Sequence, residues 1–245
     1  MPAAAPTIVA TSMGFASRGR GPYDWRPGPV FDLAFDLAGR PERPRLCYLG
    51  TATGDDPVRI AGVYGAFAGS PVEVSHLSLF TMPTVPDMRA HLLAQDVVWV
   101  GGGSVANLLA VWRVHDLDAV FRRVWEAGVV LAGVSAGSIC WYTGGTTDSF
   151  GPELRAVTNG LGFLPYGNGV HYDSEARRRP LVHQLVADGT LPTTHCTEDG
   201  VGLVYRSTEL VEAVSEADGK GAFVVSRSGD GAVEERLEPR RLKSP

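Results

Sequence analysis

Ser135 stands in a Gly-x-Ser-x-Gly pattern that joins a predicted buried strand to the start of an apolar helix. The strand is the run Val129–Ala132, and Gly133 and Gly137 flank the serine. This pattern is typical of a nucleophile elbow, in which the glycines relieve crowding around a serine on a strained turn. The backbone N–H of Ala136 would then point toward the oxygen that becomes negative during acyl transfer. An ordinary tight turn with a capping serine has the same composition.

A second glycine cluster, Gly101–Gly103, follows the apolar run Val97–Val100 and precedes a segment with helical spacing. Because the carboxyl ends of parallel strands meet at one edge of a sheet, we expect this loop to lie beside Ser135. The backbone N–H groups of Gly102 and Gly103 would then complete an oxyanion hole. Phosphate binding is the weaker interpretation, because the loop matches neither the P-loop motif nor the dinucleotide-binding fingerprint.

A serine nucleophile needs a positioned base, and histidine is the usual one. His171 follows the glycine-rich stretch Gly167–Gly169 and precedes a helix predicted over 174–187, so it suits a loop at the end of a strand. His195 is the competing base, and spacing alone does not separate the two. The other histidines are interpreted as structural or solvent-facing: His76, His91, His115 and His183.

The base in turn needs a carboxylate that fixes its tautomer and stabilises the imidazolium ion. Glu198 and Asp199 stand side by side just before a predicted strand, and either would complete a catalytic triad of serine, histidine and acid. An acidic turn that leads into a hairpin would look the same. Asp148 and Asp173 are further candidates for the acid.

The elements that must position these residues alternate between short apolar strands and one-sided helices. Runs rich in β-branched residues predict buried parallel strands over Thr7–Thr11, Arg45–Leu49, Val97–Val100 and Val129–Ala132. Apolar residues three and four apart predict helices over Val30–Ala38, Val58–Ala68, Met88–Ala94 and Ala106–Trp125. This order indicates an α/β fold, a three-layer sandwich around a mostly parallel central sheet.

The C-terminal third has a different pattern, with short apolar runs separated by glycine, aspartate and serine. The runs Val201–Tyr205, Leu210–Val214 and Gly221–Ser226 predict antiparallel strands, which we expect to extend the same sheet. A charged, proline-containing segment over 234–245 predicts a surface tail. We therefore expect one α/β domain over residues 1–233.

The composition excludes several classes of protein. The chain has 245 residues and a formal net charge of −5, which provides no basic surplus for nucleic acid or an anionic membrane. The N-terminus does not match a secretory leader, and no apolar stretch is long enough to span a membrane. The three cysteines are widely spaced, which argues against a disulfide framework or a zinc site and favours the reducing cytoplasm.

Taken together, the motifs resemble the serine peptidase family of peptidase E (aspartyl dipeptidase) and cyanophycinase. That family is related in fold to the class I glutamine amidotransferases, which have a flavodoxin-like α/β sandwich. The likeness spans about residues 46–205 and lies in the order of three segments. These are the glycine loop Val100–Ser104, the elbow Gly133–Ser138 and the histidine segment Leu161–Tyr172.

The resemblance implies Ser135 as the nucleophile and His171, rather than His195, as the base. It implies an acid just before a glycine, for which Asp199 is the first choice, and Glu198 stays open. It also implies an Asp-X dipeptide preference.

Two departures from the family pattern, Ser104 and the turn Ser12–Phe15, bear on the substrate contacts. Arg177, Arg178 or Arg179 could supply a cation for an acidic substrate, although the three also suit a solvated helix face.

The sequence therefore predicts a cytoplasmic serine exopeptidase that hydrolyses short peptides through an acyl-enzyme, without a metal or cofactor. One alternative is an esterase or amidase of the α/β-hydrolase type, in which the order along the chain is serine, acid, histidine. Another is a binding module that keeps the amidotransferase-like fold and has lost the chemistry. Pairing of two subunits in a homodimer is left open.

Overall fold

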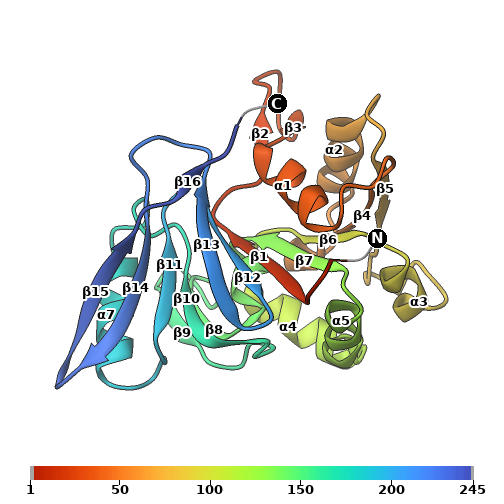
Figure 1. Ribbon diagram of the computed structural model, residues 1–245. Coiled ribbons are helices and arrows are strands. Elements are labelled where there is room, and N and C mark those ends of the chain that lie inside the picture. Colours follow the sequence, from red (N-terminus) through yellow and green to blue (C-terminus); the bar gives the residue numbers. More distant parts are fainter. Residues whose placement is uncertain (1–2, 244–245) are drawn as a thin grey trace.

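The computed structural model describes residues 3–243. Its largest sheet contains β1 (Thr7–Thr11), β4 (Arg45–Leu49), β5 (Glu73–His76), β6 (Val97–Val100), β7 (Val130–Val134), β12 (Val201–Arg206), β13 (Glu209–Ser215) and β16 (Arg240–Arg241). The strand order is β16-β13-β12-β1-β7-β6-β4-β5 (Figure 1). Strands β1, β7, β6, β4 and β5 run parallel, whereas β12 is antiparallel to both β1 and β13. The predicted parallel strands are therefore neighbours in one sheet.

Helices cover both faces of this central sheet because its strands are apolar on both faces. In β6, Val98 and Val100 pack on the side of α4 and α5, whereas Val97 and Trp99 pack on the side of α1 and α2. Figure 1 shows these two helix pairs on opposite sides of the sheet. The helices are α1 (Pro29–Leu37), α2 (Pro57–Phe67), α3 (Met88–Leu93), α4 (Val105–Val114), α5 (Leu117–Glu126), α6 (Ala136–Ile139) and α7 (Arg178–Ala187), with a 3₁₀ turn over Thr51–Thr53. The predicted three-layer α/β sandwich is confirmed.

A second sheet lies beside the central one. It contains β8 (Tyr142–Thr147), β9 (Arg155–Val157), β10 (Leu164–Gly169), β11 (Thr194–Thr197), β14 (Ala222–Ser228) and β15 (Gly231–Leu237) in the order β15-β14-β11-β10-β8-β9. The predicted extension of the central sheet is right for β12 and β13, but it is wrong for residues 221–226. That run forms β14 of the second sheet, because Phe223 and Val225 pack with Val182 and Val186 of α7.

Two helix boundaries differ from the sequence prediction. The helix predicted over 106–125 is two helices, α4 and α5, because the chain turns at Asp116, whose φ of 53° lies in the left-handed region. The helix predicted over 174–187 begins only at Arg178.

A hairpin that the sequence did not indicate lies in the loop after β1 and consists of β2 (Phe15–Ser17) and β3 (Trp25–Pro27). No helix in residues 3–243 has the length and apolar character to cross a bilayer.

The structure also differs from the surface tail predicted over 234–245, because much of this segment forms strands. Residues 234–237 belong to β15, which pairs with β14 along its whole length. Arg240 and Arg241 form β16, which pairs with β13 at the edge of the central sheet. Leu242 is buried against that sheet, and residues 244–245 lie outside the described part of the chain. Glu234, Glu235 and Arg236 are consecutive charged residues of β15, and two arginines make up β16, which is why the segment resembles a tail in sequence.

Candidate active site

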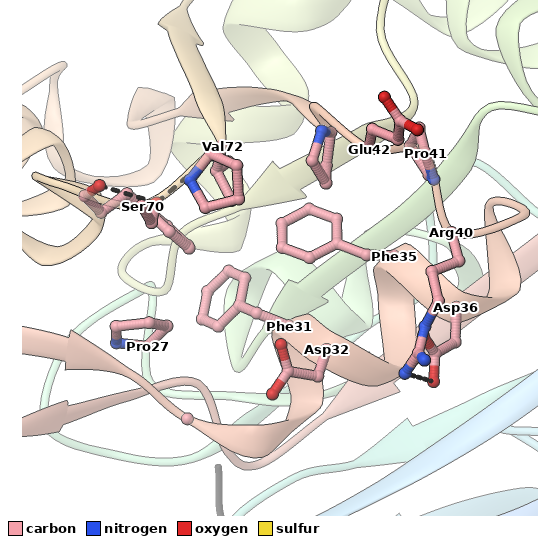
Figure 2. A pocket seen from close by; sticks show the side chains of 14 residues that line it. Pro27, Phe31, Asp32, Phe35, Asp36, Arg40, Pro41, Glu42, Ser70 and Val72 are labelled. Carbon is pink, nitrogen blue, oxygen red and sulfur yellow. Dashed lines mark hydrogen bonds and ion pairs between the residues drawn. The ribbon is translucent and has the colours of Figure 1, made fainter.

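Several hollows of similar size lie on the α1 side of the molecule. The one drawn in Figure 2 has a volume of about 460 Å³ and a floor that includes Phe31 and Phe35. At its rim, Arg40 donates to Asp36 at 2.6 Å and 3.2 Å. None of the residues predicted for catalysis lines this hollow.

A second cavity opens where β1, β6 and β7 end, and its volume is about 420 Å³. Ser135, Gly102 and Asp199 line it together, although they come from three distant parts of the sequence. Three of the residues predicted for the site therefore line this cavity. Its other walls include aromatic and charged side chains, namely Phe15, Trp25, Trp99, Arg59 and Glu216.

Ser135 has the strained backbone of a nucleophile elbow. Its φ of 58° and ψ of −115° place a non-glycine residue in a region that side chains rarely adopt. A Cβ on Gly133 would overlap the carbonyl oxygen of Gly137, and one on Gly137 would overlap that of Val100. The two glycines of the motif are therefore required by the close approach of α6 to β6 and β7.

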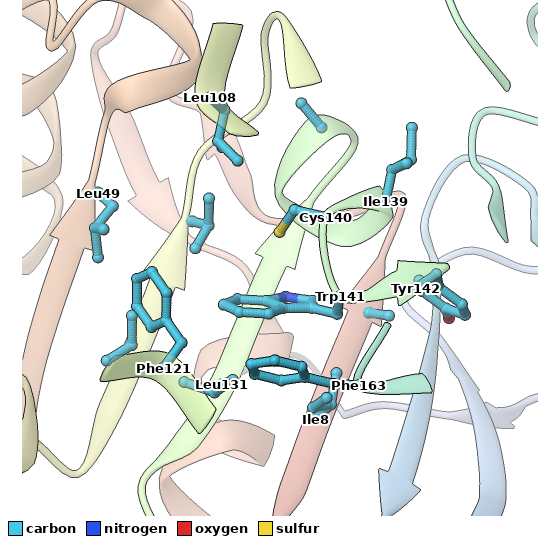
Figure 3. Close-up of a cluster of buried hydrophobic side chains, with 14 of the residues drawn as sticks. Ile8, Leu49, Leu108, Phe121, Leu131, Ile139, Cys140, Trp141, Tyr142 and Phe163 are labelled. Atoms are coloured by element: carbon cyan, nitrogen blue, oxygen red, sulfur yellow. The ribbon is translucent and has the colours of Figure 1, made fainter. Parts of the chain in front are cut away.

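The residues that follow the elbow anchor it in the core, as Figure 3 shows. Ile139, Cys140 and Trp141 are each at most 2% exposed. The Trp141 ring lies 5.5 Å from the Phe121 ring and 5.9 Å from the Phe163 ring. Strain at an active site persists only where the surrounding structure holds it, and this packing supplies that support.

The predicted oxyanion loop lies against Ser135. A Cβ on Gly102 would stand only 3.1 Å from the Cβ of Ser135, and Gly103 has a φ of 143°. In the described chain, the backbone N–H groups of Gly102, Gly103 and Ala136 donate to no backbone oxygen. Donors without a partner at this position are what a developing oxyanion requires.

His171 and Asp199 meet because β10 and β11 are parallel neighbours, with Gly169 opposite Cys196. Each of the two residues follows its strand by two positions, so both reach the same edge of the second sheet. His171 Nδ1 lies 2.5 Å from Asp199 Oδ1, which leaves Nε2 free to act as a base. Among residues 3–243, no hydrogen bond joins Ser135 Oγ to the imidazole. Such bonds often tighten only when substrate is bound.

Glu198 bonds to Gly221 and, in the described residues, not to His171. Its Oε2 accepts the N–H of Gly221 at 2.8 Å, and its own N–H donates to the Gly221 carbonyl at 3.2 Å. The N–H of Asp199 donates to Asp173 Oδ1 at 2.9 Å, and Asp173 also pairs with a lysine, Lys220. Of the acids considered from the sequence, Asp199 is thus the one that contacts the imidazole, while Glu198 and Asp173 hold its turn in place.

His195, the competing base, is a core residue. It lies on β11, is 4% exposed, and its Nδ1 is 2.6 Å from the hydroxyl of Tyr205. The ring stacks on Tyr166 at 4.2 Å, and burial lowers its pKa to about 4. Since no carboxylate in the described residues pairs with it, His195 lacks the partner that a catalytic base needs.

The cation in the cavity of Ser135 is not one of the three consecutive arginines. Arg177 pairs with surface carboxylates, Arg178 is buried and donates to a backbone carbonyl, and Arg179 stacks over two aromatic rings. None of these three lines the cavity, whereas Arg59 does. Sequence reasoning missed Arg59 because its position depends on how α2 packs against β3 and β5, and no local motif marks it.

Glu216 is the second charged wall residue that the sequence did not indicate. Burial raises the pKa of its carboxyl group. In the part of the chain that the structure describes, its side chain is in no ion pair and accepts no hydrogen bond. It follows β13 directly, so the antiparallel pairing of β12 with β13 brings it beside Gly200 and into the cavity.

Comparison with known proteins places these motifs in one family. The model of peptidase family S51 matches residues 29–212. Over 184 residues the chain is 42% identical to an uncharacterized peptidase, YgaJ, of Bacillus subtilis (strain 168). The match covers 75% of this chain and 79% of that protein. Over 142 residues it is 28% identical to a peptidase E of Shewanella denitrificans. That match covers 54% of this chain and 60% of the relative.

A solved structure shows the same fold. The crystal structure of a peptidase from an acI-B1 actinobacterium superposes on the chain with a TM-score of 0.66. The match covers 96% of this chain and 95% of that one, at 15% identity, so it bears on the fold alone.

Proposed function

Because the chain belongs to peptidase family S51 and is a serine-type peptidase, we propose that it is an exopeptidase that cleaves short peptides. Ser135 is the nucleophile, His171 the base and Asp199 the acid of its triad. The observation that carries the proposal is the 2.5 Å contact between His171 and Asp199, with Asp199 on the wall of the cavity into which Ser135 opens.

In the first half-reaction, His171 Nε2 takes the proton of Ser135 as Oγ attacks the peptide carbonyl carbon. Asp199, held at Nδ1, stabilises the imidazolium ion that forms. The carbonyl oxygen becomes negative and accepts from the free N–H groups of Gly102, Gly103 and Ala136. His171 then gives its proton to the leaving amine, which departs as the C–N bond breaks, and an acyl-enzyme remains.

In the second half-reaction, His171 deprotonates a water molecule that attacks the acyl-enzyme, and Ser135 regains its proton as the product acid leaves. The order along the chain in this scheme is serine, histidine, acid. In the α/β-hydrolase esterases the acid precedes the histidine. The contact between His171 and Asp199 thus favours the peptidase over the esterase alternative.

The roles of the two adjacent acids lead to a paired prediction. Asp199→Asn should lower kcat about 10³-fold or more, because an amide cannot stabilise the imidazolium ion. Glu198→Gln is the matched control and should keep kcat within about threefold, because its side-chain oxygen still accepts the Gly221 N–H. Steady-state kinetics on one dipeptide measures both. A large loss in Glu198→Gln with little loss in Asp199→Asn would reverse the assignment.

The cavity walls support a preference for short, charged substrates. Arg59 and Glu216 line the same cavity as Ser135, and Arg59 is only loosely paired, with its Nε 4.0 Å from Asp56. A guanidinium group suits a substrate carboxylate, such as an aspartate side chain, and an unpaired carboxylate suits a substrate ammonium group. We therefore retain Asp-X dipeptides as the proposed substrate class, with Arg59 as the residue that binds the aspartate side chain of the substrate.

This substrate preference is tested with the isosteric dipeptides Asp-Ala and Asn-Ala. We expect the parent enzyme to favour Asp-Ala, and Arg59→Gln to reduce that preference by about 10- to 100-fold, as loss of one charge-assisted hydrogen bond predicts. Arg40→Gln is the control, because Arg40 pairs with Asp36 in the hollow of Figure 2. An unchanged preference in Arg59→Gln would exclude Arg59 as the specificity residue.

We also propose a cytoplasmic location. Cys47, Cys140 and Cys196 are all buried and none is in a disulfide, and burial raises the pKa of the Cys47 thiol to about 12. Unpaired thiols of this kind are ordinary in a reducing compartment.

A further inference from the structure

Ser12 is the first residue after β1 and is one of the few buried hydroxyls beside the active site. It is 6% exposed and lines the cavity together with Ser135. In the sequence it is notable only because the turn Ser12–Phe15 departs from the family pattern. The structure shows that its side chain connects segments that are far apart along the chain.

The hydroxyl of Ser12 makes contacts in two directions. Its Oγ accepts the backbone N–H of His171 at 3.0 Å. It also lies 2.7 Å from Thr197 Oγ1 and 3.2 Å from the Thr197 carbonyl oxygen, so its own proton has an acceptor there. One side chain therefore holds the loop that carries His171 and the end of β11, which leads to Asp199.

The backbone of His171 needs such a contact. Its φ of 52° is in the left-handed region, which costs a non-glycine residue free energy unless its surroundings hold it there. The Ser12 hydroxyl accepts the N–H of this strained residue directly. Without that acceptor, the loop loses the only hydrogen bond that the described structure gives the His171 N–H.

Ser12 also connects the base to the nucleophile through β1. The carbonyl oxygen of Thr11 accepts the N–H of Ser135 at 3.1 Å, and the carbonyl oxygen of Ser12 accepts the N–H of Gly200 at 3.0 Å. Adjacent residues of one strand end thus contact the nucleophile, the base and the turn of Asp199. Ser135 follows a strand of the central sheet and His171 a strand of the second sheet, so this junction sets their relative position.

We propose that Ser12 is a positioning residue, whose hydroxyl holds His171 at the distance and orientation from Ser135 that proton transfer requires. The role rests on the proposed function of Ser135 and His171. Ser12 does not touch the reacting atoms in this scheme. It acts through the His171 backbone, so its loss should change the chemical step and leave substrate binding nearly intact.

The test compares Ser12→Ala and Ser12→Cys with Thr7→Ala. Cysteine fills the volume of serine, but its sulfur is a weak acceptor. Thr7 is a control from the opposite end of β1, buried at 3% exposure, whose hydroxyl donates to the Ala5 carbonyl at 2.8 Å. We expect kcat to fall about 10- to 100-fold in both Ser12 variants, with KM within about threefold of the parent, because small displacements of a catalytic group cost rates of this order.

A second readout needs no substrate. The proton shared by His171 Nδ1 and Asp199 should give a strongly deshielded proton NMR signal, which His171→Ala removes. We expect this signal to broaden or disappear in both Ser12 variants and to persist in Thr7→Ala. If Ser135→Ala were to remain active, the proposed function would fail, yet this signal would still report whether Ser12 holds His171.

Three results would overturn the proposal. One is a kcat in Ser12→Ala within about threefold of the parent together with an unchanged signal, and another is an equal loss in Thr7→Ala. The third is full activity in Ser12→Cys, which would assign the effect to volume instead of hydrogen bonding. If Ser12→Ala does not fold, Ser12→Cys carries the same comparison.

Discussion

Ser135→Ala is expected to lower kcat by a factor on the order of 10⁶ and to abolish labelling by a fluorophosphonate probe. The oxyanion donors and the cavity remain in this variant, but no oxygen is left to form the acyl-enzyme. Its melting temperature should stay close to that of the parent, because the change removes a single hydroxyl that makes no hydrogen bond in the described structure. Peptide hydrolysis, intact-mass spectrometry of the labelled protein and thermal unfolding measure the three quantities.

The control for this experiment is Ser70→Ala, an exposed serine at the hollow of Figure 2 and outside the proposed active site. It should retain both turnover and labelling. Labelling of Ser135→Ala at the rate of the parent would contradict the assignment of the nucleophile. Loss of labelling with retained turnover would show that the probe and the substrate use different residues.

The central sheet could be predicted because its signals are local. The runs at Thr7–Thr11, Arg45–Leu49 and Val97–Val100 are apolar on both faces, as buried parallel strands are, and the structure places strands with the same bounds there. The helices between them follow from apolar spacing in the same way. Their order along the chain then indicates which edge of the sheet receives the loops.

The second sheet could not be predicted, because its central strands lack strand-like composition. β8 and β10 have the sequences YTGGTT and LPYGNG, in which glycine and proline argue against a strand. The glycines are needed because the backbones approach closely, and a Cβ on Gly145 would overlap the carbonyl oxygen of Asn168. Tertiary packing decides these strands, and a single sequence does not show it.

The same difference between local sequence signals and tertiary packing applies to the residues of the candidate site. The elbow and the glycine loop are continuous motifs, so Ser135 and Gly102 could be selected as candidates from the sequence. The residues alone do not separate Glu198 from Asp199, and only the family resemblance favours Asp199. Adjacent side chains after a strand point in different directions, so a one-residue shift would exchange their places. The place of Arg59 in the cavity depends on how α2 packs, and no sequence motif marks it.

His171→Ala is expected to lower kcat about 10³-fold at pH 7 while leaving the fold intact. The imidazole is partly exposed at a strand end, so its loss leaves no large internal cavity, whereas proton transfer from Ser135 loses its base. KM should change little, because the ring takes part mainly in the chemical step. Single-turnover kinetics, together with thermal unfolding, separates these effects.

His195→Ala should show the opposite behaviour and is the matched comparison. Its ring is buried between Tyr166 and Tyr205, so its removal should cost about 2–4 kcal/mol of unfolding free energy, as large-to-small core substitutions do. The folded fraction should keep a kcat within about tenfold of the parent, since His195 bonds to Tyr205 and to no group of the proposed triad. If His195→Ala lost the chemical step and His171→Ala kept it, the base would be His195, and the contact between His171 and Asp199 would be structural. The pair of variants therefore separates a histidine that stabilises the second sheet from one that this sheet presents to the nucleophile.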